Sequence, residues 1–179
     1  MNWNLFKKKD KEAEVDPLRD LTLSDLKPGF VFDYDLKTWQ VTAQHVYDYD
    51  GDRVDEWEIS CADEVLYLDR EDDDELEWTL SKKIRLNDID GDLRSHLKEH
   101  EDPPETISYN GIEYSAESSD VGHFYENCGD EGQEFIVWDY LDSSEKRTLS
   151  IEQWGDDEHE ASAGNIVEEF QFSDILPSG

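Results

Sequence analysis

Alternation of apolar and polar residues runs through most of this chain and constrains its fold more than any other feature. In one such segment, Trp39, Val41 and Ala43 are each followed by a polar residue. Alternation of this kind is typical of strands with one buried face. The pairs Asp50-Gly51 and Asn110-Gly111 are sequences that join two strands in a tight hairpin. The pattern therefore predicts a mainly β protein with antiparallel sheet.

Two segments depart from the alternation. Residues 21–29 predict a short helical turn that ends in a Pro-Gly pair. Later in the chain, Ile89, Leu93 and Leu97 have the spacing of one short amphipathic helix. The predicted fold class is therefore mainly β, with antiparallel sheets in two related β lobes, barrel- or sandwich-like, and one or two short helices.

The order of the segments divides the chain into two lobes. We predict an N-terminal tail at 1–20, a first β lobe with the short helix at 21–100, a linker at 101–105 and a second β lobe at 106–179. Trp57-Glu58-Ile59 in the first half is echoed by Trp138-Asp139-Tyr140 in the second. Any two antiparallel sheets share such short motifs, so both duplication and chance similarity stay open. We expect the lobes to pack as one compact unit.

The chain is strongly acidic, with 48 Asp and Glu residues, 16 Lys and Arg residues and a formal net charge of -32. A surface of this charge repels phosphate backbones and anionic lipid headgroups. We therefore expect no nucleic-acid ligand and at most a peripheral membrane contact. The charge either keeps the protein soluble or attracts a cationic partner.

The two cysteines, Cys61 and Cys128, are isolated and do not form a CxxC motif. No apolar segment of a secretory signal follows Met1, and no apolar run approaches the roughly 20 residues that span a bilayer. These features predict a soluble, cytoplasmic protein without a disulfide framework.

The first residues combine aromatic and basic side chains. Trp3 and Phe6 precede the run Lys7, Lys8 and Lys9. Aromatic side chains favour the membrane interface, and lysines gain energy near anionic lipids. The segment is therefore a candidate for membrane or partner contact, and the alternative is a frayed terminus.

The common catalytic and phosphate-binding motifs are absent from the sequence, since it has no GxSxG, GxxxxGK[ST] or HExxH segment. We therefore predict no enzyme activity, no catalytic residues and no cofactor. Asp88, Asp90, Asp92 and Glu99 follow the spacing of a calcium loop, but Leu93 stands where that loop requires glycine. His123 and Cys128 supply only two ligands for a transition metal. We predict no metal site.

Aromatic and acidic residues occur together on several predicted strands. Ring faces attract ammonium groups and carboxylates pair with them, so such a surface suits a polyamine or a basic peptide. Core packing is the alternative role for the large rings. The candidate binding residues are Trp57, Glu58, Trp138, Asp139, Tyr140 and Glu152.

Several short motifs occur in an order along the chain that is similar to that of a known family. They are Leu26-Lys27-Pro28-Gly29, Trp57-Glu58-Ile59, Leu66-Tyr67-Leu68, Tyr109-Asn110-Gly111-Ile112-Glu113-Tyr114, Trp138-Asp139-Tyr140 and Leu149-Ser150-Ile151-Glu152. From Leu21 to Leu176 the chain resembles the bacterial domain-of-unknown-function family 4178. Val121-Gly122-His123 departs from the pattern, because the expected small residue after the glycine is absent.

The resemblance implies a genomic context and no mechanism. Genes of the family tend to lie near genes for membrane-associated stress proteins, small membrane proteins and polyamine-synthase-like enzymes, and the family offers no catalytic residues to compare. We therefore expect a non-catalytic binding or adaptor protein with a protein partner, in a bacterial membrane-stress context. The alternative is a sensor of a small cation, either a polyamine or a divalent ion.

Overall fold

The computed structural model describes residues 21–73 and 75–177 of the chain. Strands dominate this part, which confirms the predicted mainly β fold. The strands are β1 Val31–Tyr34, β2 Lys37–Tyr49, β3 Asp52–Cys61, β4 Glu64–Asp72, β5 Leu76–Ile84, β6 Thr106–Tyr109, β7 Ile112–Tyr125, β8 Gly132–Asp142, β9 Arg147–Gly155, β10 Glu158–Val167 and β11 Phe172–Leu176. The helical segments are α1 Leu93–His100 and the 3-10 turns η1 Leu23–Asp25, η2 Leu86–Asp88, η3 Glu126–Cys128 and η4 Glu169–Gln171.

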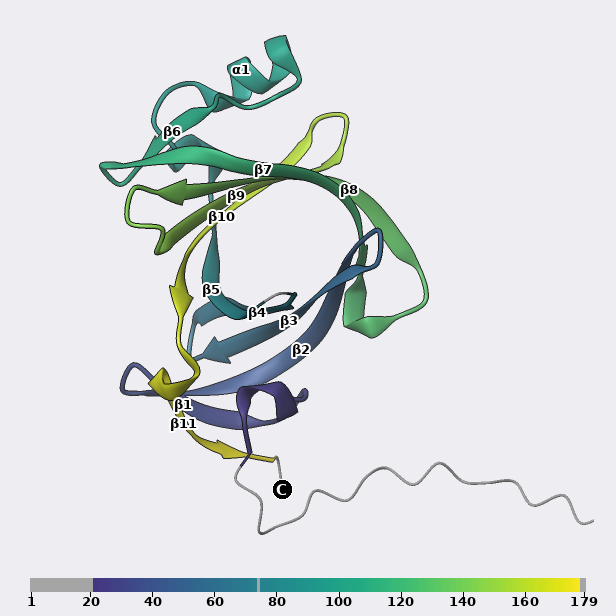
Figure 1. Ribbon diagram of the computed structural model, residues 1–179, viewed down its shortest axis with the longest axis vertical. Helices are drawn as coiled ribbons and strands as arrows, with labels where there is room; N and C mark the ends of the chain where they lie inside the picture. Colours follow the sequence, from purple (N-terminus) through teal and green to yellow (C-terminus); the bar gives the residue numbers. More distant parts are fainter. Residues whose placement is uncertain (1–20, 74, 178–179) are drawn as a thin grey trace, which may run out of the picture.

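All of these strands belong to one antiparallel sheet with the order β11-β1-β2-β3-β4-β5-β10-β9-β8-β7-β6. An additional pairing joins β2 to β7, so that Tyr47 lies opposite Phe124. The strands from β2 to β7 in this order therefore form a closed ring, and β1, β11 and β6 extend beyond it (Figure 1). Closure leaves the ring strands without free edges.

The tight hairpins form where the sequence predicts them. Asp50 and Gly51 join β2 to β3 with φ angles of 59° and 111°, and Asn110 and Gly111 join β6 to β7 with 51° and 75°. Positive φ at both central positions is the requirement of a type I′ turn, whose twist matches that of the flanking strands. These two predictions are confirmed.

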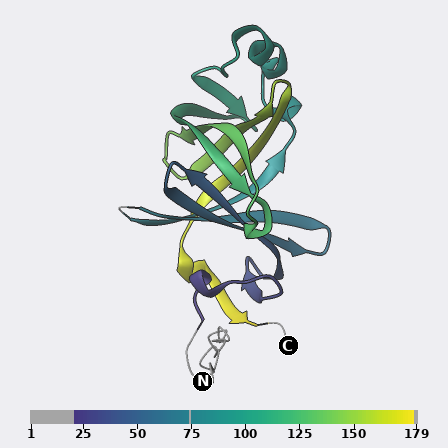
Figure 2. The ribbon, with the colours of Figure 1, turned by 90° about the vertical axis from the view of Figure 1, so that its right-hand side faces the viewer.

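Two groups of elements cover the outside of the ring at opposite ends of the molecule (Figures 1 and 2). At one end, η1, β1 and β11 pack on β2 to β5, where Trp39, Trp57 and Trp78 are buried. At the other end, α1, η2 and β6 pack on β7 to β9, where Trp138 and Tyr140 are buried. Most large apolar side chains of the ring strands are thus directed outward into these two covers, whereas Tyr47 and Val137, which line the cavity inside the ring, form a third buried cluster with Phe135.

The predicted amphipathic helix is present as α1. Asp92 caps it by accepting a hydrogen bond from the backbone N–H of Ser95 at 3.2 Å, and Leu93 and Leu97 are buried. Ile89 lies before the helix and forms a β bridge with Tyr109. The helix therefore begins later than the apolar spacing predicts, because Ile89 pairs with β6.

The division into lobes 21–100 and 106–179 with a linker at 101–105 stays a prediction. The predicted tail, 1–20, lies outside the described residues. Within the described part, no helix has the length and apolar character needed to cross a membrane.

Candidate functional site

The ring encloses a cavity of about 430 Å³, and each of its strands contributes to the lining. Carboxylate side chains predominate in this lining, and Lys83 is the one basic side chain that lines it among the described residues. The acidic lining residues are Asp52, Glu56, Asp69, Glu71, Glu77, Glu117, Asp120, Asp139 and Glu152.

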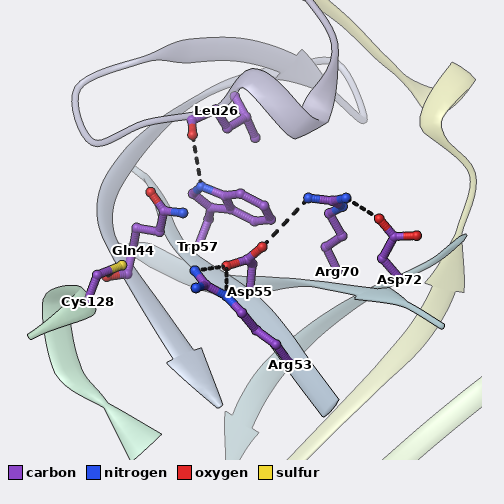
Figure 3. Close-up of polar contacts among 8 residues, drawn as sticks. All are labelled: Leu26, Gln44, Arg53, Asp55, Trp57, Arg70, Asp72 and Cys128. Atoms are coloured by element: carbon purple, nitrogen blue, oxygen red, sulfur yellow. Dashed lines mark hydrogen bonds and ion pairs between the residues drawn. The ribbon is translucent and has the colours of Figure 1, made fainter. Parts of the chain in front are cut away.

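The alternation of the strands directs these carboxylates inward. On β3, Glu56 lines the cavity, whereas its neighbour Trp57 packs on the outer face. The indole N–H of Trp57 donates to the carbonyl oxygen of Leu26 at 3.1 Å, which fixes the ring under the outer cover (Figure 3). Because Glu56 pairs with Asp69 across β3 and β4, two carboxylates lie directly beside each other inside the ring.

The innermost carboxylates are linked by a small polar network. The Tyr47 hydroxyl group lies 3.4 Å from Oε2 of Glu56 and 3.5 Å from Oε1 of Glu152. Nζ of Lys83 lies 3.2 Å from Oε2 of Glu152. Oδ1 of Asp69 is buried and has no amine, amide or hydroxyl donor among the described residues, whereas the Asp69 and Glu56 carboxyl groups are hydrogen-bonded to each other. The network therefore carries more negative charge than its own donors neutralise.

Enclosure raises the proton affinity of these acids. Burial, together with the nearby Glu152, raises the pKa of Asp69 to about 7. Burial raises the pKa of Asp139 to about 6, although the Ser150 hydroxyl group donates to it at 2.5 Å. Burial and Asp69 raise the pKa of Glu56. Removal from water and mutual repulsion both disfavour the charged carboxylates, so a positive charge in the cavity would stabilise them.

Lys83 neutralises only part of the negative charge in the cavity. Burial alone would lower its pKa, but Glu152 and Glu160 outweigh that effect and raise the pKa above its ordinary value. Lys83 is therefore a charged ammonium group at neutral pH, set against several carboxylates.

One wall of the cavity is aromatic and apolar. Tyr47, Tyr49, Val54 and Val137 line it. Tyr47 packs edge-on against Phe135, with ring centroids 5.3 Å apart. Burial and the surrounding acids raise the pKa of Tyr47, which keeps its phenol neutral. The cavity thus offers a carboxylate side for ammonium groups and an apolar side for hydrocarbon.

A second hollow of about 330 Å³ adjoins the cavity at the hairpin turns, since Tyr49, Asp52, Val54 and Glu71 line both. Two arginines lie at this hollow. Arg53 forms an ion pair with Asp55, and Arg70 forms ion pairs with Asp55 and Asp72 (Figure 3). Each guanidinium group is already paired, so the acidic character of the opening persists.

The structure distributes the candidate binding residues between the cavity and the outer clusters. Asp139 and Glu152 line the cavity. Tyr140 borders it, but its hydroxyl group donates to the carbonyl oxygen of Pro104 at 2.8 Å. Trp57 and Trp138 are buried in the outer clusters.

The other candidates lie elsewhere. Glu58 accepts a hydrogen bond from the Thr42 hydroxyl group at 2.6 Å. The N-terminal candidates for membrane or partner contact, which are Trp3, Phe6, Lys7, Lys8 and Lys9, lie outside the described residues.

Sequence reasoning missed Glu56, Asp69, Lys83 and Tyr47. Glu56 and Asp69 occupy the polar positions of alternating strands, which are ordinarily exposed to water. One signal could have identified Glu56 and Asp69, since several predicted strands carry an acidic residue directly beside a large apolar one. When such a sheet closes, the acidic residues of all these strands face the same side.

Three of the residues with metal-ligand spacing have other partners. Asp88 forms an ion pair with Arg85 at 2.8 Å, and Asp92 caps α1. The Cys128 thiol donates to the carbonyl oxygen of Gln44 at 3.4 Å (Figure 3). Residues 21–73 and 75–177 contain no group of three or more His, Cys, Asp or Glu side chains placed to hold a metal ion.

The fold and the site define a class of protein, a closed antiparallel ring of strands with an acidic interior. The family model for the domain of unknown function DUF4178 matches residues 27–169, and the chain belongs to this family. It is also 28% identical over 173 residues to an uncharacterized protein of Aquifex aeolicus (strain VF5), a match that covers 97% of this chain and 94% of the relative. No solved structure matches the chain.

Proposed function

We propose that this protein binds a small organic cation of the polyamine class inside the strand ring and does not transform it. The observation that carries the proposal is the excess of carboxylates inside the ring, among them Glu56, Asp69, Asp139 and Glu152, around Lys83, the one basic lining side chain in the described part of the chain. Enclosed charges interact far more strongly than exposed ones, so this excess favours a cationic guest.

The arrangement of the acids supports an elongated ligand. Glu71 and Glu77 face each other across β4 and β5, two residues along β4 from Asp69. Two residues along a strand span about 7 Å. The acids therefore form successive levels along the cavity, which suits ammonium groups separated by a short hydrocarbon chain.

A divalent ion is supported less well than an organic cation. Calcium binds six to eight oxygen atoms at one point. Here the carboxylates are spread over several strands, and one side of the cavity is formed by Tyr47, Tyr49 and Val54. Such a wall contributes nothing to a bare ion, but it suits the methylene groups of a polyamine.

Isothermal titration calorimetry with spermidine tests the proposal. We expect saturable binding at physiological salt, since exposed charges are screened beyond about 8 Å there whereas enclosed charges are screened less. Glu152→Gln keeps the shape of the side chain and removes its charge, so it should weaken binding by tenfold or more, about 1.4 kcal/mol. Glu131→Gln is the control, because Glu131 is exposed and its substitution removes the same charge.

Binding that physiological salt abolishes, or that Glu152→Gln and Glu131→Gln weaken equally, would contradict the proposal. It would show that spermidine only joins a diffuse layer of counterions on the acidic surface.

A protein-binding adaptor, in the membrane-stress setting that the family resemblance implies, is the second candidate. Exposed apolar side chains favour it, since Leu36 and Phe170 are 104% and 83% exposed. Leu36 follows β1 and Phe170 precedes β11, at the end where Tyr34 pairs with Phe172. A pull-down should recover a partner with the wild type and lose it with Leu36→Ser/Phe170→Ser. Recovery of the same proteins with both would contradict this role.

A further inference from the structure

The Lys83 side chain is held in the way that a bound ammonium ligand would be held. Its Nζ atom lies 3.2 Å from Oε2 of Glu152 and 2.7 Å from Oε2 of Glu160. The same atom lies 5.7 Å from the centre of the Tyr67 ring. Two carboxylates and an aromatic face are the groups that recognise ammonium ions in proteins. The chain thus contains an ammonium subsite with its own ammonium group in it.

The position of Lys83 allows it to leave this subsite. The Lys83 side chain is 36% exposed, whereas the Glu152 carboxylate that it contacts is 12% exposed. A lysine side chain has four rotatable methylene groups and gains rotamer entropy when its ammonium group is released to water. The Glu152 carboxylate is less free to move, because its side chain is largely buried and its other oxygen lies 3.5 Å from the Tyr47 hydroxyl group.

The neighbouring carboxylates provide the reason for an exchange. Oδ1 of Asp69 has no amine, amide or hydroxyl donor among the described residues, its carboxyl group is hydrogen-bonded only to the acid Glu56, and Asp69 lies on the strand next to β5, which carries Lys83. Within the described residues, the Lys83 ammonium group forms ion pairs with Glu152 and Glu160 and with no other acid. A ligand with two or more ammonium groups can satisfy the Glu152 subsite and the carboxylates deeper in the cavity together.

We propose that Lys83 is a tethered competitor, whose ammonium group occupies the subsite formed by Glu152, Glu160 and Tyr67 until an ammonium group of the ligand displaces it. This inference rests on the proposed polyamine binding and adds a residue that sets its strength. A monoamine gains little from the exchange, because it replaces one ammonium group by another. A polyamine gains the additional carboxylates, so Lys83 selects for ligands with several charges.

Calorimetry with spermidine on Lys83→Met and Lys82→Met tests the inference. Lys82 is adjacent in sequence and exposed, and it lies on the opposite face of β5, so its replacement removes the same charge outside the cavity. While Lys83 occupies the subsite, spermidine cannot bind there. The apparent affinity for spermidine is therefore its intrinsic affinity multiplied by the fraction of molecules in which the subsite is free. We expect Lys83→Met to bind spermidine about tenfold more tightly than wild type, and Lys82→Met to differ by less than about twofold. Propylamine should bind the wild type too weakly to compete with Lys83.

A spectroscopic measurement on the wild type separates displacement from a simple change in charge and does not depend on the folding of the variant. With nitrogen-15-labelled lysine, we expect saturating spermidine to move the Lys83 ammonium signal to the position of a solvent-exposed lysine and to leave Lys82 unchanged.

The outcomes distinguish the two proposals. Suppose that the wild type binds spermidine. If Lys83→Met then binds it equally or more weakly, or if the Lys83 signal is unchanged at saturation, the role of Lys83 is overturned and polyamine binding stays intact. Failure of both wild type and Lys83→Met to bind spermidine would overturn polyamine binding and the role of Lys83 with it.

Discussion

Asp69 shows at the level of one residue what closure of the ring does to a carboxylate. Burial raises its pKa from the ordinary value of 3.8 to about 7. The folded protein therefore binds the proton of Asp69 more tightly than the unfolded chain does. Below pH 4 the side chain is protonated in both states and has no effect on stability. Between pH 4 and pH 7 the free energy of unfolding falls as pH rises, and above pH 7 the loss is complete.

Asp69→Asn should therefore stabilise the protein at alkaline pH. The amide has nearly the same shape and no charge, so at pH 8 we expect a gain of about 1 to 2 kcal/mol, less than the full shift implies because the cavity holds water. At pH 4 the gain should vanish. Thermal unfolding followed by circular dichroism measures both. The control is Asp63→Asn in the exposed β3–β4 turn, and destabilisation by Asp69→Asn at pH 8 would show that the charged form is needed for folding.

The same titration should affect the ligand. Lowering the pH from 8 to 6 protonates Asp69, whose pKa is about 7, and begins to protonate Asp139, whose pKa is about 6. Spermidine loses no positive charge as the pH is lowered, so the loss of carboxylate charge should be the dominant effect, and we expect its affinity to fall several-fold. Calorimetry at the two pH values measures the change, which should be smaller in Asp69→Asn. An affinity that rises toward pH 6 would place the ligand elsewhere.

Among the elements, β5 and β10 form a seam that joins segments far apart in the chain, and Gly164 permits their close approach. A Cβ atom at this position would lie 2.6 Å from the carbonyl oxygen of Leu80 and 2.8 Å from Cβ of Ser81. The backbone on both sides is fixed by the pairing of Gly164 with Ser81 and of Asn165 with Leu80. The two strands would have to separate to accept any side chain.

Gly164→Ala should therefore lower the free energy of unfolding by about 1 to 3 kcal/mol, the usual cost of overpacking. Gly155→Ala is the matched control, because a Cβ atom there would lie 3.7 Å from the Glu158 side chain, which is ordinary contact. Urea denaturation of both variants measures the difference. Equal stability of the two would mean that the seam is not held as closely as its register indicates.

Local sequence patterns predict the strands and turns well, but they do not predict which distant segments pair with one another. Asn110-Gly111 predicts its hairpin because the turn needs only residues with positive φ. The pairing of Val46 with Tyr125 closes the ring, but it depends on contacts between segments that no local pattern connects. Alternation alone predicts that Glu56 and Trp57 lie on opposite faces of β3. It cannot determine which face is enclosed.

This limit also explains what was found of the candidate site. The candidates Asp139, which stands between Trp138 and Tyr140, and Glu152, which ends the Leu149-Ser150-Ile151-Glu152 strand motif, both line the cavity. The aromatic neighbours Trp57 and Trp138 point to the opposite face and fill the outer clusters instead. In a closed sheet the apolar face need not be the inner one when other elements cover the outside. Here η1 and α1 provide those covers, so the polar face forms the interior.

At the scale of the whole molecule, net charge dominates the electrostatics. The formal charge of -32 comes from 48 acidic and 16 basic residues, so most carboxylates have no basic partner available. Exposed pairs such as Lys37 with Glu64, at 2.5 Å, contribute little to stability, because water and salt screen them. Self-repulsion over the molecule acts against the compact state at neutral pH, and it extends over distances at which salt is effective.

Added salt should therefore stabilise this protein. Raising NaCl from a low concentration to about 0.2 M shortens the screening length to below 10 Å, which weakens repulsion between distant carboxylates more than attraction within contacting pairs. We expect the melting temperature at pH 7.5 to rise. Tetramethylammonium chloride at equal ionic strength should give the same rise, because screening depends on charge and not on the identity of the ion. A larger rise with sodium would indicate specific ion binding, and a fall with both salts would mean that the ion pairs outweigh the net repulsion.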